Sequence, residues 1–182
     1  MRGFLCWELH LCDKGCPPCK RAKNLGNQGT RGFSVLSRNR KSGITVSMMS
    51  SRILIADDDP TIRMLLRRLV SNHPSWEVCG EVATGADAVE KAASLAPDLV
   101  ILDLAMPAMN GLQAAREISK ASPHTLMLLA SVQEVSRQLA EAAREAGFRG
   151  AVTKSSGSEV VQGIEALFHS QTFFAINESL AI

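Results

Sequence analysis

Pro97-Asp-Leu-Val-Ile-Leu-Asp103-Leu-Ala-Met-Pro-Ala-Met-Asn-Gly111 is the stretch of this chain that predicts its fold. Four consecutive apolar residues, 99–102, lead directly into the carboxylate of Asp103. An unbroken run of Leu and β-branched residues is typical of a strand buried on both faces, as in parallel sheets. Asp103 would then lie at the carboxyl end of a central strand, where open α/β sheets bind their ligands. Aspartate also commonly begins a turn after a strand, so this residue alone does not decide the function.

Other apolar runs end in polar residues in the same way. Residues 52–56 lead into Asp57, Asp58 and Asp59, residues 126–130 lead into Ser131, and residues 150–153 lead into Lys154. Taken singly, each of these residues is weak evidence for a functional site. The acids could simply lie at a helix N-terminus, the serine in a turn, and the lysine on a solvated surface. Together they bring acids, a hydroxyl and an amine to one sheet edge, which indicates a phosphate and divalent-metal site.

These residues carry a resemblance to a known family. From about residue 51 to 168 the chain resembles a two-component response-regulator receiver domain with the CheY-like fold. The resemblance rests on Ile-Leu-Ile-Ala-Asp57-Asp58-Asp59-Pro60 and on the 103–111 loop quoted above, followed in order by Ser131 and Lys154. It implies an α/β fold with a doubly wound, five-stranded parallel sheet in the order 2-1-3-4-5 and helices on both faces.

The family's pattern also implies a role for each residue of the site. Asp103 would accept a phosphoryl group from a sensor histidine kinase and form an acyl phosphate. Lys154 would pair with the phosphoryl oxygens, and Ser131 would hydrogen-bond to them. Mg²⁺ would be held by Asp58 and Asp103 directly, by Asp57 through water, and by the backbone carbonyl of Ala105. The domain would then switch the binding of an unknown output protein, without turning over external substrates.

Three positions depart from the family's pattern, and one of them is Ser155, where a proline often follows the lysine. An aromatic residue often stands three positions before the lysine, and here that position holds Ala151, so aromatic gating of the signal is not supported. Ser131 lies one position farther from Lys154 than is usual in the family, which a small insertion between them would absorb.

The remaining elements follow from periodicity and capping signals. Asp59 and Pro60 are predicted to begin a helix, with Arg63 and Arg67 on its outer face. The alternation in 76–82 is typical of a half-exposed edge strand. Further helices are predicted over 86–95, over 111–120, from Val135 to a C-terminal Gly147, and over 160–168.

The first 48 residues differ in composition from the rest. They carry nine Lys or Arg against two acids, whereas from residue 49 onward sixteen acids face eleven Lys or Arg. Cys12, Cys16 and Cys19 have a spacing used in iron–sulfur enzymes, and Cys6 with His10 could add zinc ligands. Such sites need a larger fold around them. We therefore favour a disordered or mis-annotated basic leader over 1–48, with Met48 or Met49 as the start.

The domain organisation follows from these boundaries. A receiver domain is predicted over 50–170, and a C-terminal tail, 171–182, resembles an inter-domain linker. No apolar run is long enough to span a membrane, and only Cys79 of the five cysteines falls in the domain. The predicted location is therefore the cytoplasm.

Two other functions fit parts of the sequence. Asp57-x-Asp59-x-Thr61 matches the first motif of haloacid-dehalogenase-like phosphatases, with Asp57 as nucleophile and Asp59 as general acid, but the acidic pair that such enzymes need after the lysine is missing. The Ala-Asp-Asp-x-Pro start and the tail resemble receivers of the helix-turn-helix transcription-factor branch. A DNA-reading domain of about three helices does not fit before Ile182, so sequence-specific DNA binding is not expected.

Overall fold

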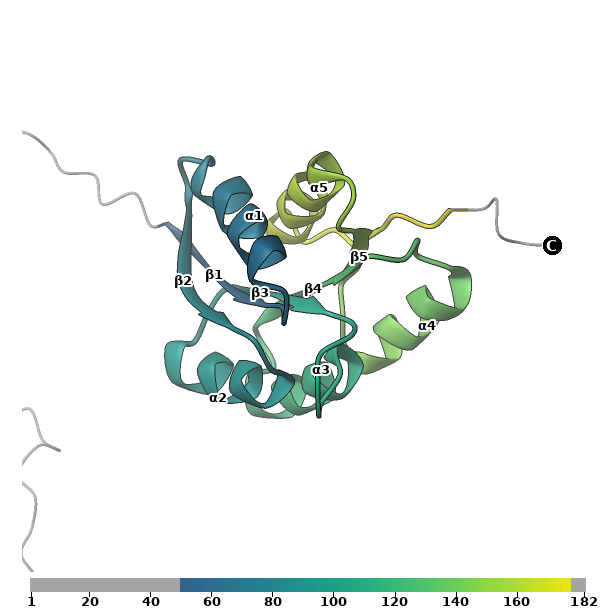
Figure 1. Cartoon of the computed structure of the whole chain (residues 1–182), viewed down its shortest axis with the longest axis horizontal. Coiled ribbons are helices and arrows are strands. Elements are labelled where there is room, and N and C mark those ends of the chain that lie inside the picture. Colours follow the sequence, from purple (N-terminus) through teal and green to yellow (C-terminus); the bar gives the residue numbers. More distant parts are fainter. Residues whose placement is uncertain (1–49, 178–182) are drawn as a thin grey trace, which may run out of the picture. The chain divides into compact units, whose positions relative to one another are not determined.

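Six parallel strands form the central sheet, in the order β2-β1-β3-β4-β5-β6. Figure 1 labels β1 to β5. The computed structural model describes residues 50–177, so the predictions for 1–48 and for the end of the tail, 178–182, lie outside the described residues. The strands are β1 Ser51–Ala56, β2 Trp76–Val82, β3 Leu99–Asp103, β4 Leu126–Ser131, β5 Gly150–Thr153 and β6 Phe173–Phe174. Five of them have the predicted order 2-1-3-4-5.

Five helices cover the sheet on both faces, as predicted. They are α1 Pro60–Ser71, α2 Gly85–Leu95, α3 Gly111–Ala121, α4 Arg137–Ala146 and α5 Gly157–Phe168. Helices α1 and α5 lie over one face, and α2, α3 and α4 lie over the other (Figure 1). None of these helices is long and apolar enough to cross a membrane.

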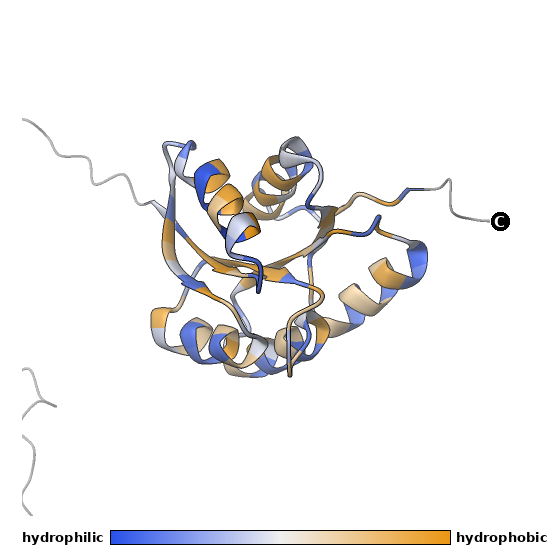
Figure 2. Ribbon diagram, viewed as in Figure 1, coloured by the Kyte–Doolittle hydropathy of each residue, from blue (hydrophilic) through white to orange (hydrophobic). Residues whose placement is uncertain are grey.

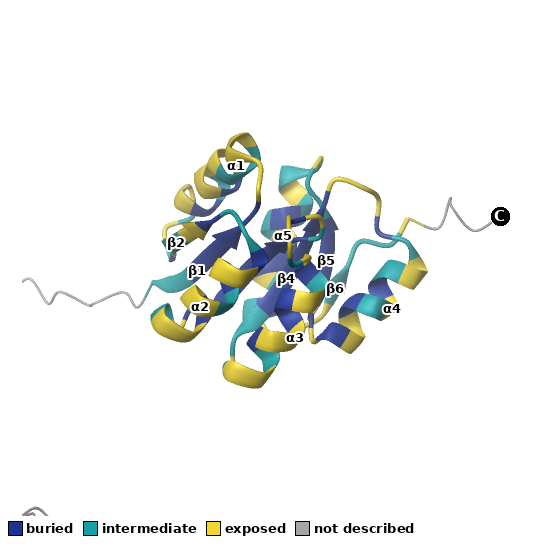
Figure 3. Ribbon diagram, turned by 60° about the horizontal axis from the view of Figure 1, so that its bottom comes forward, coloured by how far each residue is buried: buried dark blue, intermediate teal, exposed yellow. Residues whose placement is uncertain are grey.

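The apolar residues gather in two layers, one on each face of the sheet. The first layer packs α2, α3 and α4 against residues such as Leu54, Val100 and Leu129. The second packs α1 and α5 against the opposite side of the same strands, at residues such as Ile53 and Ile101. Figure 2 shows the apolar residues of the helices turned toward the sheet, and Figure 3 shows buried strands between helices that are exposed on their outer sides. Burial on both faces explains why β3 is an unbroken apolar run.

Local signals located the helix ends well except at the starts of α4 and α5, and α5 begins at Gly157, before the predicted 160. Asp59 caps α1 by accepting the backbone N–H groups of the next turn, and Pro60 is the first helical residue, as predicted. Gly147 caps the C-terminal end of α4 with a φ of 100°, as predicted, but the helix begins at Arg137 with Ser136 as its N-cap. The predicted start at Val135 is wrong because this residue forms a parallel bridge to Ile176 of the tail.

Strand β2 lies at one edge of the sheet, as predicted, but the alternation of its side chains between the two faces is interrupted. The pairing with β1 shifts by one residue between Val78 and Gly80. An extra residue at such a bulge reverses which face the following side chains occupy. Trp76 and Val78 therefore pack on the α1 and α5 side, whereas Cys79 and Val82 pack on the opposite side. The strand is half-exposed at the sheet edge, as predicted, but its buried side chains change face at the bulge.

Strand β6 corrects the prediction of five strands. The start of the tail continues from α5 alongside β5, where Phe173 pairs with Gly150 and Phe174 with Ala151. Glycine at position 150 permits this close approach, because a Cβ there would lie only 2.7 Å from the carbonyl oxygen of Phe173. Residues 171–177 therefore belong to the folded domain.

Candidate functional site

Asp103 ends β3 at the carboxyl edge of the sheet and is 4% exposed. The loop that follows it returns closely, since the Gly111 N–H donates to the carbonyl of Leu104 at 3.0 Å. A Cβ at Gly111 would collide with the carbonyl oxygen of Asp103, so glycine lets α3 begin against the end of β3. Asn110 then caps α3 in a reciprocal pair of hydrogen bonds with Gln113. The loop holds Asp103 at a defined position.

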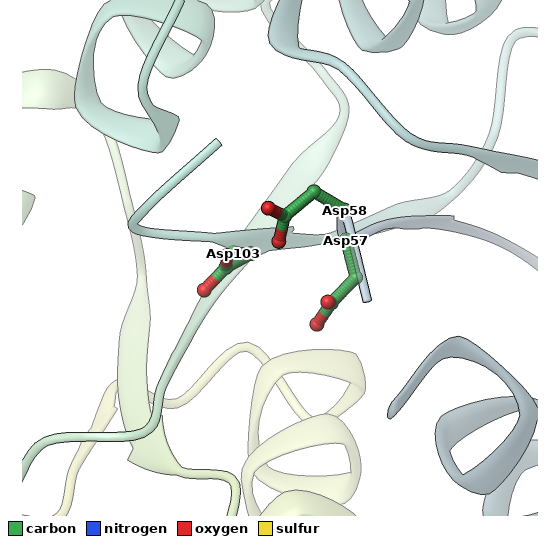
Figure 4. Close-up of side chains that lie close together, drawn as sticks. All are labelled: Asp57, Asp58 and Asp103. Carbon is green, nitrogen blue, oxygen red and sulfur yellow. The ribbon is translucent and has the colours of Figure 1, made fainter. Parts of the chain in front are cut away.

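Asp57 and Asp58 follow β1, which is the strand next to β3. The Asp57 side chain is buried, and its Oδ1 accepts the Asp59 N–H at 3.0 Å. The backbone N–H of Asp57 donates to the Val82 carbonyl at 3.1 Å. Asp58 is exposed. One carboxylate oxygen from each of Asp57, Asp58 and Asp103 lies within 4.8 Å of the others (Figure 4). The predicted convergence of the three acids is therefore present.

Lys154, just beyond β5, bridges two of these acids. Its Nζ lies 2.5 Å from Asp57 Oδ2 and 2.7 Å from Asp103 Oδ1, and its side chain is 5% exposed. A lysine on a solvated surface would show neither the burial nor the double contact. One ammonium nevertheless faces three carboxylates, so the group keeps an excess of negative charge that a divalent cation would offset.

Burial raises the pKa of the Asp57 carboxyl above its ordinary value, and the neighbouring Lys154 ammonium opposes this rise. Asp57 Oδ2 is buried and accepts no hydrogen bond of good geometry, although it touches the ammonium. A buried carboxylate oxygen without a hydrogen bond is costly unless a cation or water satisfies it. Carboxylate oxygens, together with water, are the ligands that Mg²⁺ prefers, so the residues present fit this ion.

Ser131 ends β4, between β3 and β5 in the sheet. Its neighbour Ala130 pairs with Asp103, and Ser131 itself pairs with Thr153, so the sheet register brings it to the same edge. It is 2% exposed, and its Oγ accepts the Gln133 N–H at 3.0 Å. That arrangement leaves the hydroxyl proton available to a further acceptor. Ala105 lies in the exposed loop two residues after Asp103, and its carbonyl as a metal ligand stays a prediction.

One contact near the acids was missed by the sequence reasoning. Arg63, predicted on the outer face of its helix, is partly buried, and its Nη1 donates to the backbone carbonyl of Asp57 at 2.5 Å. The available signal was its position one turn after the Asp59 cap, from which a long side chain can reach back over the loop.

Comparison with known proteins agrees with this geometry. Residues 53–165 match the profile of the family described as the response regulator receiver domain. The chemotaxis protein CheY of Thermotoga maritima is 36% identical over 117 residues, which are 64% of this chain and 96% of that protein. A LuxR-family response regulator from Aurantimonas is structurally similar, with a TM-score of 0.66, 33% identity, and coverage of 69% of this chain and 90% of that one.

Other relatives are longer. Protein-glutamate methylesterase/protein-glutamine glutaminase 4 of Myxococcus xanthus is 40% identical over 108 residues, which are 59% of this chain but 31% of that protein. The chain thus spans about a third of the length of the methylesterase relatives that it matches. The receiver domain of NarL from Mycobacterium tuberculosis has a TM-score of 0.63 and 29% identity, covering 67% of this chain and 98% of that one.

Proposed function

Since this chain belongs to the response regulator receiver domain family, we propose that its Asp103 accepts a phosphoryl group in a Mg²⁺-dependent reaction. The observation that carries the proposal is the position of Asp103 at the end of β3. There its Oδ1 lies 2.7 Å from the Lys154 ammonium, and its carboxylate lies within 4.8 Å of those of Asp57 and Asp58. A nucleophilic carboxylate that lies among potential metal ligands and within hydrogen-bond distance of an ammonium group suits phosphoryl transfer.

The phosphoryl donor in this proposal is a phosphorylated histidine of a sensor kinase. A carboxylate oxygen of Asp103 forms the new P–O bond while the P–N bond breaks and the imidazole leaves with its electron pair. Lys154 moves its contact from the carboxylates to the phosphoryl oxygens, and Ser131 donates its hydroxyl proton to one of them. A bound Mg²⁺ would neutralise the charge of the acids and of the transferring group. Asp58, Asp103 and the Ala105 carbonyl would hold it directly, and Asp57 through water.

The consequence of phosphorylation would be a change in the binding of an output protein. The methylesterase relatives carry their named activity in proteins of which this chain matches only about a third, so we do not assign that activity here. We infer a signalling module that is modified once for each signal, without turnover of an external substrate.

The phosphatase alternative is disfavoured by the state of the residue that would be its general acid. Its general acid would be Asp59, but hydrogen bonds from the backbone of Thr61 lower the pKa of Asp59, whereas a general acid needs a raised pKa.

Acetyl phosphate with Mg²⁺ tests both functions. We expect one phosphoryl adduct by intact mass, labile to base and hydroxylamine and mapped to Asp103. Asp103→Asn should abolish it while leaving the circular dichroism spectrum unchanged, because Asn has nearly the same volume. The matched control is Asp98→Asn, a substitution at the opposite end of the same strand, which should label normally. An adduct mapped to Asp57, or phosphate-ester turnover that survives Asp103→Asn and is lost in Asp57→Asn, would overturn the assignment.

A further inference from the structure

Arg63 reaches from α1 back to the loop that carries two of the site's acids. Its Nη1 donates to the backbone carbonyl of Asp57 at 2.5 Å, and its own N–H donates to the Asp59 carbonyl at 3.0 Å. The guanidinium therefore binds the loop from which its helix begins, and residues 57–63 form a closed, hydrogen-bonded unit. The proposed phosphoryl transfer does not involve this contact.

Asp58 depends on this unit for its position. Within the described part of the chain no hydrogen bond or ion pair holds its exposed carboxylate, so its direction is set by the two peptide groups that flank it. Asp57 Oδ1 holds the following peptide group by accepting the Asp59 N–H at 3.0 Å. Arg63 holds the preceding peptide group through the Asp57 carbonyl. Loss of the guanidinium would remove the hydrogen bond that holds the peptide group before Asp58.

We propose that Arg63 is a positioning residue for the cation site, acting through the Asp57–Asp58 peptide and not on the ion. The inference rests on the proposed function, since it assumes that the three acids bind a divalent cation. Groups that orient metal ligands commonly contribute 10- to 100-fold to metal affinity.

The charge of Arg63 makes the test decisive, because positioning and electrostatics predict opposite signs. Removal of a positive charge close to a cation site can only strengthen cation binding, by a modest factor that falls as salt rises. Removal of an anchor of Asp58 weakens it. A weaker site after loss of the positive charge is therefore evidence for positioning.

The test measures the Mg²⁺ dissociation constant by calorimetry. In Arg63→Gln, which keeps much of the aliphatic stem but cannot span the distance, we expect the constant to rise about tenfold. Arg63→Lys should recover to within about threefold of the wild type, since an ammonium on a long stem can still donate to the carbonyl. Thermal melting without Mg²⁺ checks that each variant folds.

Arg67 is the matched control, one turn later on the same helix. It carries the same charge, but its Nη1 lies 3.3 Å from Glu81 Oε1 and does not contact the loop. Arg67→Gln should change the dissociation constant by less than about twofold, since its charge is exposed and screened.

Labelling by acetyl phosphate gives a second readout. In Arg63→Gln the Mg²⁺ concentration for half-maximal labelling should rise about tenfold, while the rate at saturating Mg²⁺ stays within about twofold of the wild type. A lost maximal rate would place Arg63 in the transfer step and overturn the proposal. So would an Arg63→Gln variant that binds Mg²⁺ as tightly as the wild type, or an Arg63→Lys variant as weak as Arg63→Gln.

Asp58→Asn separates this inference from the function on which it rests. If Asp58→Asn binds Mg²⁺ as tightly as the wild type, the proposal that these three acids form the cation site is wrong. If Asp58→Asn weakens binding and Arg63→Gln does not, the cation site stands and only the role of Arg63 fails.

Discussion

The carboxyl group of Asp57 lies fully buried at the end of β1, between Lys154 and the Asp59 N–H. Burial disfavours its charged form, and the ammonium favours it. Because burial is the larger of the two influences, its pKa is raised. The same loop carries a carboxyl group in the opposite situation. Asp59 is exposed, and hydrogen bonds from the α1 backbone lower its pKa.

These opposite shifts predict opposite dependences of stability on pH. Between its ordinary pKa of 3.8 and its raised value, Asp57 holds more protons in the folded protein than in the unfolded chain. The free energy of unfolding therefore falls as pH rises through this window. Without Mg²⁺, Asp57→Asn should gain stability relative to the wild type as pH rises above 3.8, reaching a plateau above the raised pKa. Urea denaturation in EDTA at several pH values measures the difference.

Asp59→Asn provides the comparison of opposite sign. A lowered pKa contributes stability that is present above the ordinary pKa and is lost as pH falls through the folded value. Asp59→Asn should therefore be less stable than the wild type at neutral pH, and the difference should vanish in acid. Two variants that changed stability with the same sign would contradict the environments described for these residues.

At the scale of elements, β6 is the part of the fold with the smallest hydrogen-bonded ladder. Phe173 and Ala175 donate their N–H groups to the Arg149 and Ala151 carbonyls at 3.0 and 2.9 Å. Phe174 packs beside the α2–α4 layer, with Arg144 Cζ 4.0 Å from its ring centre. An aromatic side chain thus lies in register with Ala151, the position that often carries an aromatic residue in the family. The strand therefore has tertiary contacts as well as ladder bonds.

We expect Phe174→Ala to lower the free energy of unfolding by about 1–2 kcal/mol, less than for a fully buried Phe, because the ring is half-buried. Urea denaturation measures this loss. Gln171→Ala, at an exposed position in the same segment, should change stability by less than about 0.5 kcal/mol. Equal effects of the two substitutions, with rapid exchange of the Phe173 and Ala175 amides, would show that the segment does not dock as a strand.

At the scale of the whole molecule, the described residues, 50–177, contain both apolar layers and all the residues of the candidate site. The apolar layers begin at Ile53, the acids at Asp57, and the family match spans 53–165. The first 48 residues carry a net positive charge, whereas the residues from 49 onward carry a net negative charge. The domain should need nothing from the leader in order to fold.

A protein shortened to begin at Met49 should accordingly unfold at the same urea concentration as the full chain and label at Asp103 to within about twofold. The shortened protein retains the residues of both apolar layers and of the candidate site. Metal analysis of the full chain supplies the control. One equivalent of iron or zinc that is lost in Cys16→Ser would refute a dispensable leader, as would failure of the shortened protein to fold.

The sequence alone was sufficient to predict the convergence of Asp57, Asp58, Asp103, Ser131 and Lys154. Each follows an apolar run, and parallel strands bring their carboxyl ends to one edge whatever the details of packing. Helix starts such as the Asp59 cap were also predictable, because capping and periodicity depend on residues that are close together in the sequence.

Contacts between distant segments were decided only by the tertiary structure. The shift in β2, the start of α4 and the docking of β6 depend on pairing registers that no local pattern specifies. The double contact of Lys154 and the reach of Arg63 to the Asp57 carbonyl likewise depend on distances across packed elements. Local periodicity determines which residues form a strand or helix, whereas packing in three dimensions determines which of their polar atoms meet.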